Sequence, residues 1–349
     1  MRNHGFVQEF LPGLAILVFA ALIPCRIVAQ ESVAPAEKEH LVGPIAEVSY
    51  EKPFKTPGPG GLRWDAKYLV WWRRDNSYSD LSPNIEMYDR TGTLFGKMRI
   101  WLPEAGLMYI EDAAASKDGR VVAGGWARDL RGEEVGWFAE IAPGGNAVNY
   151  VSTTPFLTHS VTFGPDGSIW LMGYQLGPGE RSDTAPDQHI VRHYGADDKL
   201  KGEHVLLSTL QCGEAYFLHV IGRPMLTASS DRVAVFLPEC HKWMELSANG
   251  ELLGQWTWRT DNLASAEPGG QPREITRFAL TSANKLYGNV YPPGDPWLVH
   301  FDRASSQWLP VNTDDLANAG VPFDHLEGSD GEQLVYRSNS VFVWAKPEE

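Results

Sequence analysis

Three polar residues occupy equivalent places in a repeated pattern and could act together on one ligand. Glu111, His159 and Arg223 each stand seven residues before the turn of a predicted β-hairpin. A carboxylate, an imidazole and a guanidinium can orient a small polar molecule, and an acid near an imidazole can work as a general acid/base pair. The alternative is structural, because polar side chains at a channel mouth also satisfy one another or water.

Arginines in the longer loops form a second candidate group. Arg128 and Arg181 lie in long connections that are flanked by Trp126 and Tyr174. Arginine beside aromatic rings suits the recognition of carboxylates or sugars. Because the same loops contain many acidic residues, a solvated surface of mixed charge is the alternative. The candidate ligand-binding residues are therefore Glu111, His159, Arg223, Arg128 and Arg181, and the expected partner is a small polar or anionic ligand or a protein.

Common catalytic and metal-binding signatures are absent from the sequence. It has no GxSxG, HExxH, Walker-type, GxGxxG or EF-hand motif. A metal site needs at least three converging oxygen or nitrogen ligands, and only Glu111, His159 and His325 are candidates. We therefore assign no catalytic residue, no metal ligand and no cofactor from the sequence.

The cysteines predict one covalent cross-link. Cys212 and Cys240 are the two that follow the N-terminal segment containing Cys25. In an oxidising compartment such an isolated pair favours a disulfide, for which the Cα atoms must lie roughly 4–7 Å apart. The alternative is two separate buried thiols. No CxxC occurs, so the spacing does not support a zinc site.

The elements that must position these side chains are short strands in a repeat. Each repeat begins with an apolar strand, a polar turn and a second apolar strand, which is typical of a β-hairpin. The turns recur at intervals of about 50 residues. They lie at Asp65-Ala66, Asp118-Gly119, Asp166-Gly167, Ser230-Asp231, Ala283-Asn284 and Asp330-Gly331.

A second hairpin follows each of the first five. Its strands alternate apolar with polar residues at period two, which indicates half-buried strands rather than helices. The five segments are 85–101, 137–151, 190–207, 242–258 and 297–311. Two hairpins make a four-stranded unit that cannot bury both faces alone, so the units must stack around an axis.

The two ends of the chain complement each other. The sixth unit stops after the strand Val341–Trp344, whereas the alternating segment Ile45–Glu51 precedes the first unit. Pairing of these two strands would close a ring. The sequence thus predicts an all-β fold, a six-bladed β-propeller closed by an N-terminal strand that pairs with the C-terminal blade. An open pair of β-sandwiches is the alternative that the length allows, but it leaves the six-fold recurrence unexplained.

One of the hairpins resembles a known repeat. The segment Phe163–Trp170, which reads FGPDGSIW, is similar to the blade repeat of NHL-type and virginiamycin B lyase-like propellers. The pattern from Ile85 to Trp101 resembles the outer half of such a blade. Because the sharp motif occurs in one unit only, the resemblance implies the fold and not the lyase activity. The catalytic His and Glu residues of that family match no position here, and none is carried over.

The N-terminus has the parts of a secretory signal. Arg2 provides positive charge, Leu11–Ile23 is an uncharged and mostly apolar run, and Ala29 precedes the expected cleavage site. The apolar run is short for a bilayer span, and an uncleaved anchor is the alternative. We expect residues 1–29 to be a signal peptide, residues 30–42 a flexible mature N-terminus, and residues 43–349 a single β-propeller domain. The mature chain would then be extracytoplasmic, either periplasmic or secreted, and lipidation of Cys25 stays open.

The charge limits the partners. The formal net charge is −14, from 44 acidic and 30 basic residues. A surface this acidic repels phosphate backbones and anionic lipid, so we expect neither nucleic acid nor a membrane as a partner. The sequence favours an exported module that binds a ligand or a protein through its long-loop face. A lactonase- or lyase-like enzyme acting at the channel mouth is the alternative, because propellers host many activities.

Overall fold

Regular structure in the described residues is almost entirely β-strand. The structure, a computed structural model, describes residues 41–49, 60–145, 147–175, 187–212, 225–259, 263, 273–291, 296–314, 325–338 and 341–347. The helical elements whose bounds are described are single 3-10 turns, η1 (Pro143–Gly145), η2 (Leu207–Leu210) and η3 (Pro238–Cys240). The predicted all-β fold is confirmed. The predicted signal peptide lies outside the described residues.

Three sheets have four antiparallel strands each, in chain order. One sheet contains β11 (Phe156–Phe163), β12 (Ile169–Gln175), β13 (His189–Tyr194) and β14 (Leu200–Leu206). The next contains β15 (Met225–Ala228), β16 (Arg232–Leu237), β17 (Lys242–Ser247) and β18 (Leu252–Thr257). The third contains β19 (Glu274–Leu280), β20 (Leu286–Tyr291), β21 (Leu298–Asp302) and β22 (Gln307–Pro310). Each sheet consists of the two hairpins that the repeat predicts.

A fourth sheet has an additional strand that the repeat does not predict. Its order is β10 (Val148–Ser152), β9 (Glu134–Ile141), β8 (Val121–Asp129), β7 (Ala105–Ala115) and β4 (Asp75–Ser77). The short β4 comes from the first unit and pairs antiparallel with β7 of the second, with Asn76 opposite Met108. The backbone N–H of Ile110 also donates to the carbonyl of Arg74 at 2.9 Å. This pairing fixes the loop after β3 against the inner strand of the next unit.

The first and last units are joined in one eight-stranded sheet, so the sheets number five where the repeat predicts six separate units. Its order is β1 (Leu41–Ser49), β25 (Val341–Pro347), β24 (Leu334–Ser338), β23 (His325–Ser329), β2 (Gly60–Asp65), β3 (Tyr68–Arg73), β5 (Ile85–Asp89) and β6 (Leu94–Met98). The units merge because Trp64 and Asp65 pair in parallel with Gly328 and Ser329. Gly328 permits this close approach, since its φ is 151° and an added Cβ would lie 2.2 Å from the carbonyl oxygen of Trp64.

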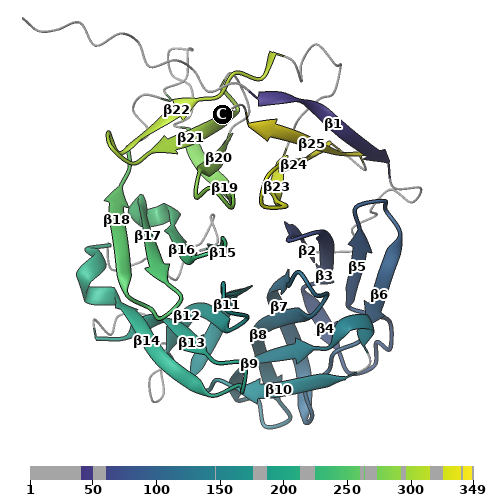
Figure 1. Ribbon diagram of the computed structural model, residues 1–349. Coiled ribbons are helices and arrows are strands. Elements are labelled where there is room, and N and C mark those ends of the chain that lie inside the picture. Colours follow the sequence, from purple (N-terminus) through teal and green to yellow (C-terminus); the bar gives the residue numbers. More distant parts are fainter. Residues whose placement is uncertain are drawn as a thin grey trace, which may run out of the picture. The chain divides into compact units, whose positions relative to one another are not determined.

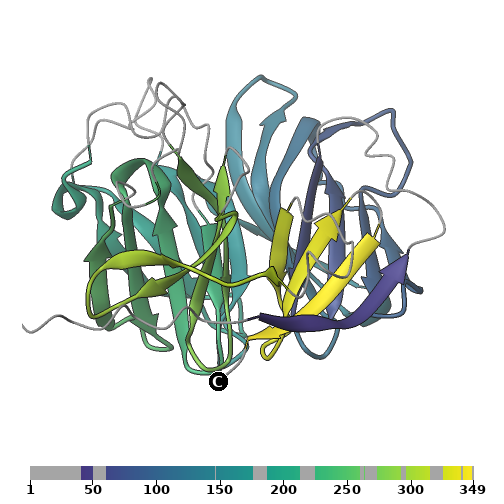
Figure 2. The same ribbon diagram turned by 90° about the horizontal axis from the view of Figure 1, so that it is seen from above.

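The N-terminal strand pairs with the last strand of the chain, as the sequence predicts. β1 runs antiparallel to β25, with Ala46 opposite Trp344 and Ser49 opposite Val341 (Figures 1 and 2). β1 begins at Leu41, four residues before the alternating segment that the sequence indicates. The first and last strands of the described chain therefore lie side by side.

The first strand of each unit lies toward a common centre in the unit Lys38–Glu349. Contacts run from β2 to β7, β11, β15, β19 and β23 in turn, and β23 contacts β2. Figure 1 shows these six strands around the centre, with the other strands of each unit farther out. This arrangement makes the fold β-propeller-like, and we call these six strands the inner strands.

Hydrophobic clusters fill the spaces between successive units. Phe138 of β9, for example, packs with Phe156 and Phe163 of β11. The stacked rings of Phe236 and Phe278 join β16 to β19 at a centroid distance of 4.1 Å. Between the last unit and the first, Trp344 meets Trp64 edge-on at 5.0 Å. Burial of such aromatic area between sheets is the main stabilising term of the fold.

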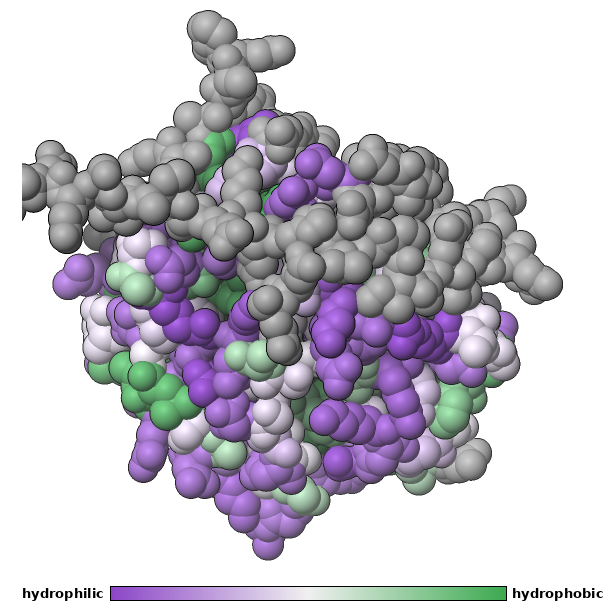
Figure 3. Space-filling model, turned by 45° about the horizontal axis from the view of Figure 1, so that its top comes forward, coloured by the Kyte–Doolittle hydropathy of each residue, from purple (hydrophilic) through white to green (hydrophobic). Residues whose placement is uncertain are grey.

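The described surface is mainly polar. In the coloured part of the face that Figure 3 shows, hydrophilic residues predominate and hydrophobic residues form separate spots. Exposed apolar side chains such as Leu130 and Leu252 are scattered over different strands and loops. Within the described ranges, no helix has the length and apolar character that a membrane crossing needs.

Candidate functional site

A pocket of about 330 Å³ lies where the inner hairpin turns converge. Every one of the six turns that the repeat predicts supplies lining residues. They include Ala66, Ser116, Gly167, Ser230, Ser282 and Asp330, one from each turn. We call this space the inner-turn pocket. Its volume falls in the range of small-molecule sites, which begins at roughly 300 Å³.

Asp65 stands at the inner end of the pocket. It is the last residue of β2, and its side chain is 22% exposed. A second cavity of about 30 Å³ is also lined by Asp65, together with Arg63 and Glu327. Asp65 therefore separates the inner-turn pocket from a smaller space among the inner strands.

Arg63 is a buried guanidinium that connects four units. Its Nη1 donates to the carbonyl of Val161 at 2.9 Å, and its Nη2 donates to the carbonyl of Leu226 at 3.0 Å. Nη1 also contacts Asp112 at 3.3 Å. These partners belong to β11, β15 and β7, whereas Arg63 belongs to β2. One side chain thus ties inner strands that are far apart in the sequence.

The two carboxylates near Arg63 differ in how well they are satisfied. Asp112 Oδ2 accepts from Ser160 Oγ at 2.6 Å and from the N–H of Val161 at 3.0 Å, in addition to Arg63. Asp65 Oδ2 lies 3.4 Å from Arg63 Nη2, but it accepts no hydrogen bond from the described residues. The Arg63 guanidinium therefore faces two carboxylates, and it donates a hydrogen bond to Asp112 but not to Asp65 Oδ2.

Burial raises the pKa of both carboxyl groups. For Asp65, burial outweighs the lowering by Arg63, and the nearby Asp112 raises the pKa further. For Asp112, burial outweighs the lowering by Arg63 and by the hydrogen bond from Ser160. Both shifts follow from removing negative charge from water with a single cation to share. At a pH below the usual aspartate pKa, both carboxyl groups are neutral in the folded and in the unfolded protein. As the pH rises through the raised pKa values, ionising these groups costs free energy in the folded protein and lowers its stability.

The rim of the pocket carries one exposed cation and one cation that is already paired with carboxylates. Lys117 is exposed at the turn after β7. Arg120 instead pairs with Asp118 at 3.1 Å and with Glu140 at 2.7 Å, and its guanidinium lies over the Phe163 ring at 4.9 Å. Lys117 is therefore the basic group of the rim that is placed to meet a ligand.

The inner-strand position singled out by the sequence coincides with a structural irregularity. β-bulges occur at Glu111 in β7, at His159 in β11 and at Thr276 in β19, each where the register with the next strand shifts. Bulges re-aim a side chain away from the regular alternation. The three residues are therefore equivalent in structure as well as in sequence.

Glu111 is buried and already paired. Its Oε1 accepts from Arg74 Nη2 at 2.9 Å and from Trp126 Nε1 at 3.2 Å, and Tyr109 stacks on Trp126 at 4.0 Å. The strand β4 brings Arg74 to this place. Arg74, which is 37% exposed, is the charged group that a ligand could reach here, and Glu111 is the group that orients it.

The other predicted residues are dispersed. The His159 ring lies 5.1 Å from that of Tyr174, next to the end of β12. Arg128 is exposed and pairs with Glu134 across β8 and β9 at 3.3 Å. Arg181 and Arg223 lie outside the described residues. The structure thus leaves convergence of the predicted set untested, and the long-loop face stays a prediction.

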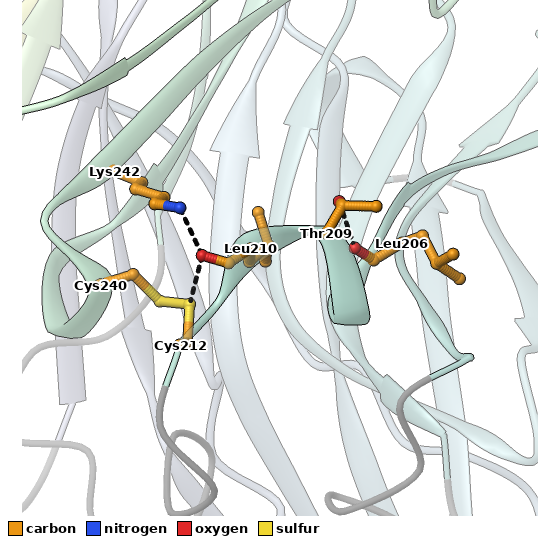
Figure 4. Close-up of a disulfide and its surroundings, with 6 residues drawn as sticks. All are labelled: Leu206, Thr209, Leu210, Cys212, Cys240 and Lys242. Atoms are coloured by element: carbon orange, nitrogen blue, oxygen red, sulfur yellow. Dashed lines mark hydrogen bonds between the residues drawn. A yellow bond between two sulfur atoms is a disulfide. The ribbon is translucent and has the colours of Figure 1, made fainter. Parts of the chain in front are cut away.

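The predicted cysteine pair is bonded. Cys212 and Cys240 form a disulfide with Cα atoms 5.2 Å apart, between the segment after β14 and η3 (Figure 4). Lys242 at the start of β17 donates to the carbonyl of Leu210 beside it. The bond cross-links the third and fourth units. Among the described residues, no group of three or more His, Cys, Asp or Glu side chains is placed to hold a metal ion.

Sequence reasoning missed the inner-turn pocket and its charged end. A signal was present, because Arg63 and Asp65 are charged residues in a strand whose neighbours Leu62 and Trp64 are apolar. Charges in a strand that the repeat places innermost must be paired or used. The partners of Arg63, however, are Asp112 and backbone carbonyls of other units, which no local pattern reveals.

A histidine pair lies in the unit of β11–β14. His193 and His204 stack on Trp170, with ring centroids 4.4 and 5.4 Å from that of the indole. Their Nε2 atoms are buried and have no hydrogen-bond partner among the described residues. Burial lowers the pKa of both rings. For His193, Lys201 adds to the lowering and Asp166 opposes it. For His204, His189 adds to the lowering and Glu203 opposes it.

This pair should make stability fall in mild acid. Since the folded pKa values lie below the unfolded value, roughly 6.5, the stabilisation is complete above that value and is lost as the pH falls through the folded values. We expect the melting temperature of the double variant His193→Gln/His204→Gln to change less between pH 7.5 and 5 than that of the wild type. The exposed His241, replaced by Asn, is the matched control and should leave the wild-type slope unchanged. Equal slopes in all three proteins would contradict the assignment.

Comparisons with known proteins give structural similarity only. No protein-family model matches the sequence, and no curated protein matches it. Solved structures similar to this chain include a protein of unknown function from Bacteroides caccae, with 11% identity, a TM-score of 0.39, and coverage of 74% of this chain and 84% of that one. A candidate exported protein from Bacteroides fragilis has 8% identity and a TM-score of 0.49 over 87% and 95% of the two chains. The WD40 domain of Neurospora crassa Pan2 has 10% identity and a TM-score of 0.46 over 89% and 98%. All three TM-scores are below 0.5, so the propeller-like assignment rests on the strand order and packing of this chain.

Proposed function

We propose that this protein is an exported binding module that holds a small polar molecule in the inner-turn pocket. The observation that carries the proposal is that all six inner turns converge on one cavity of about 330 Å³. A pocket of this size is large enough to enclose a small molecule. A site assembled from every repeat also depends on the whole fold, which preorganises it.

The scaffold in this proposal is a closed six-bladed propeller. In support, the inner strands contact one another in a complete cycle, and separate hydrophobic clusters lie between each pair of successive units, including the last and the first. The eight-stranded sheet then counts as two blades that share the short parallel pairing of Trp64 and Asp65 with β23. A closed ring leaves few open sheet edges.

The lining favours binding of a polar ligand over an apolar one. Five serines from four of the turns line the pocket, at positions 116, 229, 230, 282 and 329, together with Asp65 and Lys117. Hydroxyl and charged groups supply hydrogen bonds that fix a ligand's orientation. The disulfide supports an oxidising, extracytoplasmic location.

A pocket-filling variant tests this function. Ser230 is an exposed turn residue of the lining, and Ser230→Trp would place an indole in the pocket. We would record melting temperatures of the protein with a panel of amino acids, amines, monosaccharides and dicarboxylates. A ligand at 100 times its Kd stabilises by about 2.7 kcal/mol, and Ser230→Trp should abolish the shift. The same substitution at Ser305, in an outer turn, should not. Compounds that stabilise both variants equally would place the site elsewhere.

A further inference from the structure

The charges at the inner end of the pocket do not balance. Arg63 is the cation shared by Asp65 and Asp112, with distances of 3.4 and 3.3 Å to the two carboxylates. Its two Nη groups also donate to the carbonyls of Val161 and Leu226 and to the hydroxyl of Thr162. With both carboxyl groups ionised, this cluster carries one net negative charge in surroundings of low dielectric.

The unbalanced charge is on Asp65 rather than on Asp112. Asp112 accepts hydrogen bonds at both oxygens, from Ala113 N–H at 2.9 Å on Oδ1 and from Ser160 and Val161 on Oδ2. Asp65 Oδ2 accepts none from the described residues, although it is buried. Hydrogen bonds from the backbone at Ala66 and Ala115 lower the pKa of Asp65, but they do not outweigh its burial. A positive charge placed next to this carboxylate would relieve part of the cost of burying it.

Asp65 is also the group of the two that reaches the pocket. It lines the inner-turn pocket and is partly exposed there, whereas Asp112 is not among the lining residues. The other carboxylates of the lining are occupied, because Asp118 pairs with Arg120 and Asp330 accepts from the N–H groups of Glu332 and Gln333. Asp65 is therefore the carboxylate of the lining whose negative charge is balanced only by a cation that it shares with Asp112.

We propose that the inner-turn pocket recognises a primary ammonium group and that Asp65 is its counter-ion. The ammonium group supplies three donors and one positive charge, which matches an under-satisfied carboxylate beside a single shared guanidinium. The serine hydroxyls of the turns hold the polar remainder of the molecule, and Lys117 favours a tail that carries an acidic group. This inference rests on the pocket being the binding site.

Ethanolamine and ethylene glycol form a matched pair of probes, since they have almost the same size and differ in charge. By calorimetric or NMR titration, we expect ethanolamine to bind with a Kd in the millimolar range and at least ten times more tightly than ethylene glycol. β-Alanine should bind more tightly than ethanolamine, and Lys117→Gln should remove that difference. Equal affinities of ethanolamine and ethylene glycol would overturn the inference.

The variant Asp65→Asn removes the charge and keeps the shape. It should weaken ethanolamine binding at least ten-fold and leave ethylene glycol unaffected. Asp118→Asn, at the rim of the same pocket, should change neither affinity by more than about two-fold, because its carboxylate is already paired. Asp65→Asn that binds ethanolamine as the wild type does would also refute the assignment.

The wild-type protein provides a test that does not depend on any variant. Ethanolamine stays protonated in mild acid, whereas Asp65 must be ionised to bind it. The affinity should therefore be lower at pH 4 than at pH 7.5, with Asp112, Asp118 and Asp330 as the other carboxyl groups around the pocket. If ethanolamine does not bind at 100 mM, the ammonium site is wrong. If a compound of the panel stabilises the wild type but not Ser230→Trp, the pocket remains the binding site and only the ammonium assignment is wrong.

Discussion

Replacing Arg63 with methionine should destabilise the protein by about 3–5 kcal/mol, the range found when one partner of a buried ion pair is removed. Methionine fills a similar volume, so the loss would come from Asp112 and Asp65 without their cation and from the carbonyls of Val161 and Leu226 without their donor. Urea denaturation would measure the change. Arg63→Lys should lose less, because it keeps the charge but not the forked geometry.

The matched control is Arg128→Met. Arg128 also pairs with a carboxylate, Glu134, but it is 50% exposed, and such pairs contribute at most about 1 kcal/mol. The pH gives a second check. Without Arg63, the pKa of Asp112 should rise further, so the deficit of Arg63→Met should shrink as the pH falls toward 4 and grow as it rises. A deficit no larger than that of Arg128→Met would mean that Arg63 does not tie the inner strands together.

Removing the disulfide should have the second largest effect. Replacing Cys212 and Cys240 with serine opens a covalent loop across the third and fourth units. The chain-entropy model gives a loss of about 3–4 kcal/mol for a loop of this length, which corresponds to a melting temperature lower by about 5–10 °C. Circular dichroism at rising temperature would record it.

A reducing agent separates the covalent bond from the effect of the serines. Dithiothreitol should lower the melting temperature of the wild type to that of the double variant and leave the variant unchanged. Two reactive thiols in the unfolded, unreduced chain that starts at Gln30 would show that the bond does not form.

The strand pattern was accessible from the sequence because its signals are local. An aspartate-glycine turn between two alternating strands determines a hairpin within about 12 residues, whatever the rest of the chain does. The Asp166-Gly167 hairpin is therefore found where it is predicted, with Phe163 opposite Ile169. The strand β4 is different, since Asp75–Ser77 has no alternating pattern and forms only because β7 offers an edge.

The candidate site was less accessible, because its parts meet only after folding. The turn residues Ala66 and Asp330 line one pocket although more than 250 residues separate them. The pattern did mark Glu111 and His159 as equivalent, and both stand at bulges. It could not show that Glu111 is neutralised by Arg74, because the pairing of β4 with β7 brings that arginine there.

The pairing of β1 with β25 sets the order of events when the protein is made. β1 leaves the ribosome among the first strands, and its partner leaves last, about 300 residues later. Until Pro347 has emerged, β1 lacks the strand with which it pairs, so this pairing cannot form while the chain is still being synthesised. A chain truncated before Val341 would leave β1 without its partner and β24 as an open edge, and it would become a target for aggregation or degradation. The pairing of β25 with β1 therefore forms only in chains that have been synthesised as far as β25.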